Sequence, residues 1–198
     1  MIYGLKILLK SKSYKYNIGF AVLMNLKDVI RTIPDWPKEG VMFRDITTLL
    51  KDAKAFNYVI DNLCERYKND NIDLVAGIES RGFILGGAIA HKLYKGFIPI
   101  RKEGKLPHKT EKESYDLEYG RATVEIHADA IPKGAKVLLV DDLIATGGTA
   151  LAAANLIERL GGKVVECAFI IGLPDLKGMN KLKEKGYKVI TLVDFEGE

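Results

Sequence analysis

Apolar residues along the chain recur with two different periods. Between Phe56 and Tyr67 they return every three or four positions, which is the spacing of one face of a helix. Elsewhere they form short runs that are typical of buried strands, at 74–78, 97–100, 122–126, 136–140, 164–171 and 188–193. Further helices are expected at 82–94 and from Thr149 to about Leu160. Because strands alternate with helices, the pattern predicts an α/β fold with a mainly parallel sheet.

The segment before these elements has a different character. In residues 1–23 lysines interrupt the apolar positions, so no hydrophobic region of a signal peptide forms. After Met24 the apolar residues share one helical face, which predicts a short helix capped by Asn25 and stopped by Pro34; they are Leu26, Val29, Ile30 and Ile33. We expect a single domain over 24–198, with Met24 as a candidate start and 1–23 as an extension of doubtful role.

One connection is unusually long. Residues 102–121 are polar and contain glycine, and structureless segments of this length are uncommon inside a compact domain. Where they occur, they usually serve as lids or binding loops. We interpret the segment as a lid, with the following strand at 122–126 pairing beside it.

Composition excludes several classes of protein. The 198 residues are 47% apolar and 28% charged, which is ordinary for one globular domain, and no run approaches the ~18 apolar residues of a membrane span. The net charge of +4 is too small to indicate a nucleic-acid partner. Cys64 and Cys167 lie in apolar patterns, which favours buried reduced thiols in a cytoplasmic protein. His91, His108 and His127 lack metal-ligand spacing and are interpreted as surface or hydrogen-bonded residues.

The most informative segment begins where the strand at 136–140 ends. Asp141 and Asp142 follow the strand, then a loop of small residues, then a helix near Thr149. Ligands of open α/β sheets bind at the carboxyl ends of the strands, where this loop lies. Gly147 and Gly148 allow backbone N–H groups to converge on one point beside the helix N-terminus, which predicts a cradle for a phosphate.

The side chains of this segment add to the cradle. Thr146 and Thr149 offer hydroxyl donors. Asp141 and Asp142 repel a phosphate but accept hydrogen bonds from two vicinal hydroxyls, such as those of a ribose. The segment therefore predicts a site for a ribose 5-phosphate. The alternative is an acidic helix cap after an ordinary strand.

The string Val-Asp-Asp-Leu-Ile-Ala-Thr-Gly-Gly-Thr resembles the phosphoribosyl-diphosphate (PRPP) signature of the type I phosphoribosyltransferases, most of all in the members that act on adenine. The resemblance extends over residues 24–193. It implies a central, mainly parallel sheet flanked by helices, a small N-terminal hood at about 24–50 and the lid at 102–121. It also implies that PRPP and AMP are bound by Asp141, Asp142, Ala145, Thr146, Gly147, Gly148 and Thr149.

A second strand end carries the sequence Ile-Glu-Ser-Arg-Gly, with Arg81 offering a bidentate fork for an anion. Alone this is a weak signal, because a surface arginine often caps a loop. The segment resembles the diphosphate loop of the family, which implies a cis peptide at Glu79–Ser80 and a diphosphate held by Ser80 and Arg81. Arg101 and Lys105 follow another strand end, and the resemblance adds them to the diphosphate site, one of them in a neighbouring subunit's site.

The base and the proton transfer are assigned by resemblance. Gly-Val-Met-Phe-Arg-Asp resembles the adenine-binding hood, in which Phe43 stacks on the purine against Leu143, and main-chain groups near Met42 and the Arg44 side chain contact the ring. In the lid, the resemblance implies that Glu118 exchanges the purine proton and that Tyr119 closes the site. The alternatives are a Met-Phe pair in the core and a mixed polar loop.

Together these motifs imply transfer of the 5-phosphoribosyl group from PRPP to adenine, giving AMP and diphosphate in purine salvage. Mg²⁺ is expected, carried mainly by PRPP oxygens and water, with no dedicated protein metal site. We expect a cytoplasmic homodimer without nucleic-acid or membrane partners. Two alternatives are a PRPP-sensing regulator of the same fold, which would carry an added DNA-binding module, and an enzyme for another nucleobase.

Overall fold

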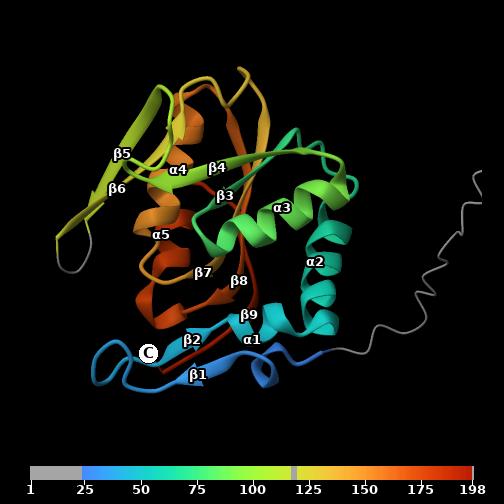
Figure 1. Cartoon of the computed structure of the whole chain (residues 1–198), viewed down its shortest axis with the longest axis vertical. Helices are drawn as coiled ribbons and strands as arrows, with labels where there is room; N and C mark the ends of the chain where they lie inside the picture. Colours follow the sequence, from blue (N-terminus) through green and yellow to red (C-terminus); the bar gives the residue numbers. More distant parts are fainter. Residues whose placement is uncertain (1–23, 117–119, 198) are drawn as a thin grey trace, which may run out of the picture.

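A twisted seven-stranded sheet forms the centre of the computed structural model, which describes residues 24–116 and 120–197 (Figure 1). In chain order the elements, with η for a 3-10 helix, are η1 Leu26–Asp28, β1 Arg31–Ile33, β2 Phe43–Asp45, α1 Thr47–Lys51, α2 Ala53–Tyr67, β3 Leu74–Ile78, α3 Arg81–Leu93, β4 Gly96–Lys102, β5 Thr110–Asp116, β6 Arg121–His127, β7 Lys136–Ile144, α4 Gly148–Arg159, β8 Lys163–Gly172, η2 Pro174–Leu176, α5 Gly178–Glu184 and β9 Val189–Asp194.

The strands lie in the order β5-β6-β4-β3-β7-β8-β9. The five strands from β4 to β9 are mutually parallel, and β6 is antiparallel to both β4 and β5, so the predicted mainly parallel α/β sheet is confirmed. From β3 the chain moves to β4 on one side, and later strands extend from β7 on the other side. Such a reversal of direction is where open α/β sheets bind ligands.

Two apolar layers cover the faces of the sheet. In β7, Leu138 and Val140 pack with α2 and α3, whereas Val137 and Leu139 pack with α4 and α5 on the opposite face (Figure 1). A strand that is buried on both sides needs apolar residues at every position, which explains its continuous apolar run. Each such side chain contributes about 1.5–3 kcal/mol when it leaves water.

A small two-stranded hood lies near the end of β9 (Figure 1). In it β1 pairs antiparallel with β2, so that Ile33 lies opposite Phe43. The predicted helix over 26–33 is therefore wrong beyond its first turn. Asn25 caps η1 as expected, accepting a hydrogen bond from the Lys27 N–H at 3.3 Å. The chain then becomes extended before Pro34, because a residue that precedes proline disfavours helical geometry.

The predicted polar loop over 102–121 is also partly wrong. Residues 110–116 form β5, which pairs with β6 from Thr110–His127 to Asp116–Arg121. The segment is therefore a hairpin arm at the edge of the sheet, and β5 lies against α4 (Figure 1). Its alternating charges hide the strand period, because both faces carry polar side chains.

Several smaller expectations have clear outcomes. Cys64 and Cys167 are buried and unpaired, and burial raises their thiol pKa values to about 11 and about 12. His91 and His108 are exposed, which agrees with the expectation of surface or hydrogen-bonded histidines. His127 is partly buried, and its Nε2 has no hydrogen-bond partner in the described part of the chain. In residues 24–116 and 120–197, no helix has the length and apolar character that a membrane crossing requires.

Candidate active site

The carboxyl ends of three neighbouring strands bring the candidate residues together. β7 continues to Ile144, so Asp141 and Asp142 lie within this strand and not after it, where the sequence predicted them. Ile78 of β3 pairs with Ile100 of β4, and Gly77 pairs with Val140 of β7. The residues that follow Ile78, Ile100 and Val140 therefore lie close together. Gly82 allows α3 to begin close to β7, because a Cβ at Gly82 would lie 2.8 Å from the Val140 carbonyl oxygen.

The loop after β7 has the form of an anion cradle. Gly147 has a left-handed φ of +75°, which a side chain disfavours, and it caps α4 without any side-chain hydrogen bond. The first N–H groups of α4 have no partner within the helix, and the helix dipole adds positive potential at the same point. The first backbone hydrogen bond of the helix is donated by the Leu151 N–H to the Gly147 carbonyl at 3.0 Å.

Gly178, at the start of α5, packs directly against the backbone of this loop. Its N–H donates to the Ala145 carbonyl at 3.0 Å. A Cβ at Gly178 would lie 2.1 Å from that carbonyl oxygen and 2.6 Å from the Gly147 nitrogen, so only glycine fits. Sequence reasoning missed this residue, because no local motif links Gly178 to the phosphate segment.

The two carboxylates have different environments. An Asp141 carboxylate oxygen accepts the Asp142 N–H at 2.9 Å, and burial, reinforced by the neighbouring Asp142 carboxylate, raises the pKa of Asp141 well above its usual value. Asp142 is 4% exposed and forms an ion pair with Arg81. The structure thus joins two residues that the sequence assigned to different parts of the substrate.

Glu79 organises the diphosphate side. The peptide between Glu79 and Ser80 is cis, as the resemblance implied. The Glu79 carboxylate accepts Arg101 Nε at 2.9 Å and the Lys102 N–H at 2.8 Å. The Arg101 guanidinium is therefore held at the same strand ends as Arg81, while Ser80 is exposed to solvent.

Glu125 of β6 holds the loop that carries Lys105. One of its carboxylate oxygens accepts the N–H groups of Lys105 and Leu106, both at 2.9 Å, and the other accepts the Thr110 hydroxyl at 3.2 Å. Burial alone would raise the pKa of Glu125, but these donors outweigh it and keep the pKa below its usual value. Arg101 also donates to the Lys105 carbonyl at 3.1 Å. Sequence reasoning did not single out Glu125.

The hood residues are placed on β2 and the loop before it. Phe43 lies edge-on to the Trp36 ring, with centroids 4.4 Å apart. Arg44 turns the other way, donating to the Thr32 hydroxyl at 2.7 Å and stacking over the Phe195 ring at 4.4 Å. Met42 and the β7 residue Leu143 are both partly buried.

The hairpin supplies a residue that the sequence treated as ordinary. The Thr149 hydroxyl, at the start of α4, donates to the Tyr115 hydroxyl at 2.9 Å. Glu118 and Tyr119, the predicted acid/base and closing residues, lie outside the described residues.

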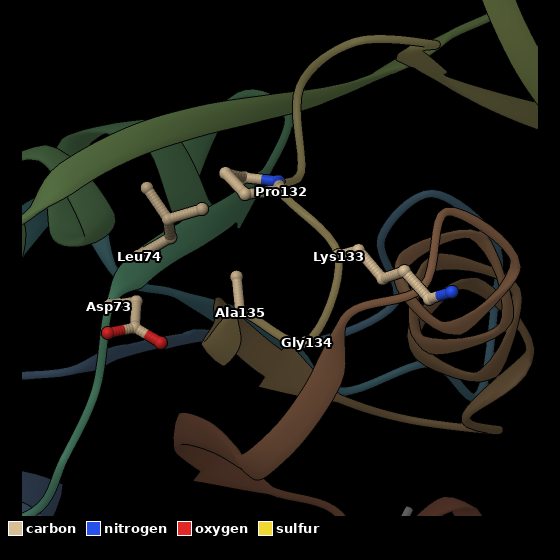
Figure 2. Close-up of a pocket in the computed structure, with 6 residues that line it drawn as sticks. All are labelled: Asp73, Leu74, Pro132, Lys133, Gly134 and Ala135. Carbon is tan, nitrogen blue, oxygen red and sulfur yellow. The ribbon is translucent and has the colours of Figure 1, made fainter.

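A separate shallow pocket of about 440 Å³ lies at the amino ends of β3 and β7 (Figure 2). Asp73 on its wall accepts the Lys136 N–H at 2.8 Å. The carboxyl ends of these strands, and with them the candidate site, lie at the opposite end of the sheet. This pocket therefore plays no part in the predicted chemistry.

Comparisons with known proteins agree on one family. The phosphoribosyl transferase domain model matches residues 46–197. The adenine phosphoribosyltransferase of Methylobacillus flagellatus is 62% identical over 173 residues, which are 87% of this chain and 98% of that protein. The crystal structure of adenine phosphoribosyltransferase from Thermoanaerobacter pseudethanolicus has a TM-score of 0.82 and 50% identity, covering 85% of this chain and 97% of that one.

A complex in the same group contains ligands. The adenine phosphoribosyltransferase of Saccharomyces cerevisiae, complexed with D-2,5-dideoxy-2,5-imino-altritol 1,6-bisphosphate and adenine, has a TM-score of 0.79 and 41% identity. The match covers 85% of this chain and 96% of that one.

Proposed function

The chain belongs to the phosphoribosyltransferase family, and from this membership we propose how its residues carry out the reaction of the adenine phosphoribosyltransferases. The reaction transfers the 5-phosphoribosyl group of PRPP to adenine, giving AMP and diphosphate, a step of purine salvage. One observation carries the residue assignment. The N-terminus of α4, the Asp141–Asp142 pair and two arginines meet at adjacent strand ends.

The 5-phosphate of the substrate binds the N–H groups at the start of α4, among them that of Thr149, with a hydroxyl donor from Thr146. The ribose hydroxyls donate to Asp141 and Asp142. Because Asp142 is paired with Arg81 in the free protein, PRPP binding exchanges that ion pair for a ribose hydroxyl on Asp142 and a diphosphate oxygen on Arg81.

The leaving diphosphate is bound by Ser80, Arg81, Arg101 and Lys105. Bond cleavage leaves an electron-poor ribosyl carbon and a departing anion, so fixed cations beside the diphosphate stabilise the transition state. Glu79 and Glu125 keep Arg101 and the Lys105 loop in place, so little reorganisation is needed as the charge develops.

Adenine binds between Phe43 and Leu143, with main-chain groups near Met42 reading its amino edge and Arg44 contacting the ring from beyond. For Arg44 this requires release from Thr32 and Phe195. Glu118 accepts the proton that adenine loses, and Tyr119 closes the site against water, which would otherwise hydrolyse PRPP.

Mg²⁺ accompanies PRPP in this proposal. In the described residues no group of three metal-ligating side chains is present. Of the nearest carboxylates, Asp142 is paired with Arg81, and burial raises the pKa of Asp141 and so disfavours its charged form. This donor set fits an ion that keeps water and substrate phosphates as ligands. When bound, the ion would supply further positive charge for the diphosphate.

We also propose a cytoplasmic homodimer. Ile84 and Tyr94, on and just after α3, are 50% and 94% exposed, which leaves apolar surface that a second copy would cover. The buried, unpaired thiols of Cys64 and Cys167 suit a reducing compartment. Sedimentation equilibrium of the purified protein tests the dimer directly.

A base panel tests the substrate. The protein is incubated with PRPP, Mg²⁺ and one of adenine, guanine, hypoxanthine, xanthine, uracil or orotate, and nucleotide formation is followed. Adenine should be preferred at least about 10²-fold, because groups that pair with an amino edge are mispaired by a 6-oxo purine. Comparable turnover of hypoxanthine would refute the adenine assignment. PRPP binding without turnover of any base would support the regulator instead.

A further inference from the structure

The hydroxyl of Tyr115 lies at the phosphate cradle although it belongs to a different element. Tyr115 is on β5, five positions after the start of the hairpin arm at Thr110. Its hydroxyl oxygen accepts the Thr149 hydroxyl at 2.9 Å. Its ring lies over Gly148, where an added Cβ would be 3.0 Å from Tyr115 Cδ2. The ring thus covers the first turn of α4.

The hairpin is fixed to α4 by contacts beyond the cradle. Asn155 donates to the Glu113 carboxylate at 3.0 Å, and Arg159 donates to the Lys112 carbonyl at 2.8 Å while forming an ion pair with Glu113. These contacts hold β5 along the length of the helix. The position of Tyr115 therefore does not depend on its own hydroxyl.

The chemistry of that hydroxyl suits an anion. A phenol can accept one hydrogen bond and donate another at the same time. Because Thr149 is the donor in the existing bond, the Tyr115 proton remains available, and across residues 24–116 and 120–197 it has no other acceptor. A phosphate dianion has only acceptor oxygens and needs such a donor.

We propose that Tyr115 binds the 5-phosphate. This residue comes from the hairpin, and its hydroxyl adds a hydrogen-bond donor to the cradle at the start of α4. The inference rests on the proposed function, because it adds a donor to the same phosphate site. It also links the arm to the substrate: an occupied cradle holds β5 on α4, and a hairpin displaced from α4 withdraws the donor.

The test compares Tyr115→Phe with Tyr187→Phe. Tyr187 is a matched control, because its hydroxyl also makes one hydrogen bond, to Glu158 at 3.0 Å, on a different part of the molecule. Calorimetry measures the affinities for ribose 5-phosphate, AMP and adenosine, and steady-state kinetics give KM for PRPP and for adenine. Thermal unfolding checks that both variants fold.

Tyr115→Phe should weaken ribose 5-phosphate and AMP about tenfold or more and raise KM for PRPP similarly, which is the usual effect of losing a hydrogen bond to a charged group. Adenosine affinity and KM for adenine should change less than about twofold, as should every value for Tyr187→Phe. Unchanged AMP affinity in a folded Tyr115→Phe protein would overturn the proposal. An equal loss for adenosine would also overturn it, since Tyr115 would then only shape the site.

Failure of the proposed function gives a different result. If the unmodified protein did not convert adenine, the substrate assignment would fail while the ribose 5-phosphate measurements still decided the role of Tyr115.

Discussion

At the scale of single residues, the phosphate cradle depends on a glycine that comes from another helix. We predict that Gly178→Ala disrupts the cradle, because its Cβ would lie 2.1 Å from the Ala145 carbonyl oxygen and 2.6 Å from the Gly147 nitrogen. Both are backbone atoms, so the loop itself must move. We expect a loss of about 1–3 kcal/mol in unfolding free energy and at least tenfold weaker AMP binding, measured by urea unfolding and calorimetry.

Gly87→Ala is the matched control. Gly87 lies inside α3, and an added Cβ would have no atom within 4 Å, so alanine should be neutral or stabilise by about 0.5–1 kcal/mol. Wild-type AMP affinity in the Gly178→Ala protein would show that the loop tolerates displacement and that its support from α5 is unimportant.

At the scale of elements, the loop after β4 depends on one buried carboxylate. We predict that Glu125→Ala lowers kcat/KM for PRPP at least tenfold, because the N–H groups of Lys105 and Leu106 lose their acceptor and the loop moves. Glu125→Gln should retain most of the activity, since its amide oxygen still accepts both N–H groups while its NH₂ donates to Thr110.

The control for this loop is Glu103→Ala. Glu103 pairs with Lys112 at 2.8 Å on the exposed surface of the same segment, and such pairs contribute little. If Glu103→Ala and Glu125→Ala had equal effects on PRPP kinetics, the special role of the buried carboxylate would be refuted.

The hood is held by a second carboxylate whose contribution depends on pH. Thr47 and Arg31 donate to Asp45, and these hydrogen bonds lower its pKa to about 2. A pKa depressed in the folded state stabilises the fold above the unfolded value near 4, and this stability is lost as the pH falls toward 2. The full shift corresponds to roughly 2 kcal/mol, and screening at the half-exposed Arg31 brings it nearer 1.

We therefore predict that Asp45→Asn is about 1–2 kcal/mol less stable than the unmodified protein at pH 7, and that the difference shrinks below about pH 4. Urea unfolding at pH 7, 5, 4 and 3 measures it, with the exposed Asp129→Asn as control. A stability difference that stayed constant down to pH 3 would contradict the assigned cause.

The sequence predicts an element well when the residues of that element alone determine its structure, and poorly when the structure depends on contacts with distant segments. The strand predicted at 74–78 matches β3, because burial on both faces demands a continuous apolar run. The strand predicted at 136–140 is found but is too short, since β7 continues through Asp141 and Asp142 to Ile144. β5 was missed because its charged residues form no apolar period, and β1 because its partner β2 follows ten residues later. The phosphate segment was found since it is contiguous, whereas Tyr115, Glu125 and Gly178 reach the site from distant segments.

At the scale of the whole molecule, the proposed site needs no residue before the hood. We predict that a chain beginning at Met24 keeps the activity and melting temperature of the full chain. A chain beginning at Arg31 should be much less stable, because it lacks Leu26 and Ile30, which are each 4% exposed. The three proteins are compared by thermal unfolding and AMP formation. A folded but inactive chain from Met24 would contradict the prediction.

The order of the strands has one more consequence, for solubility. A sheet edge with unpaired backbone groups can recruit the edge of another chain and begin a fibre. At one edge β5 presents the alternating charges of Glu111, Lys112 and Glu113, which repel a flat partner. At the other edge β9 is rich in valine, leucine and isoleucine, and η1 packs beside it. The helical turn at Leu26–Asp28 therefore lies where it would hinder the approach of another chain to this edge.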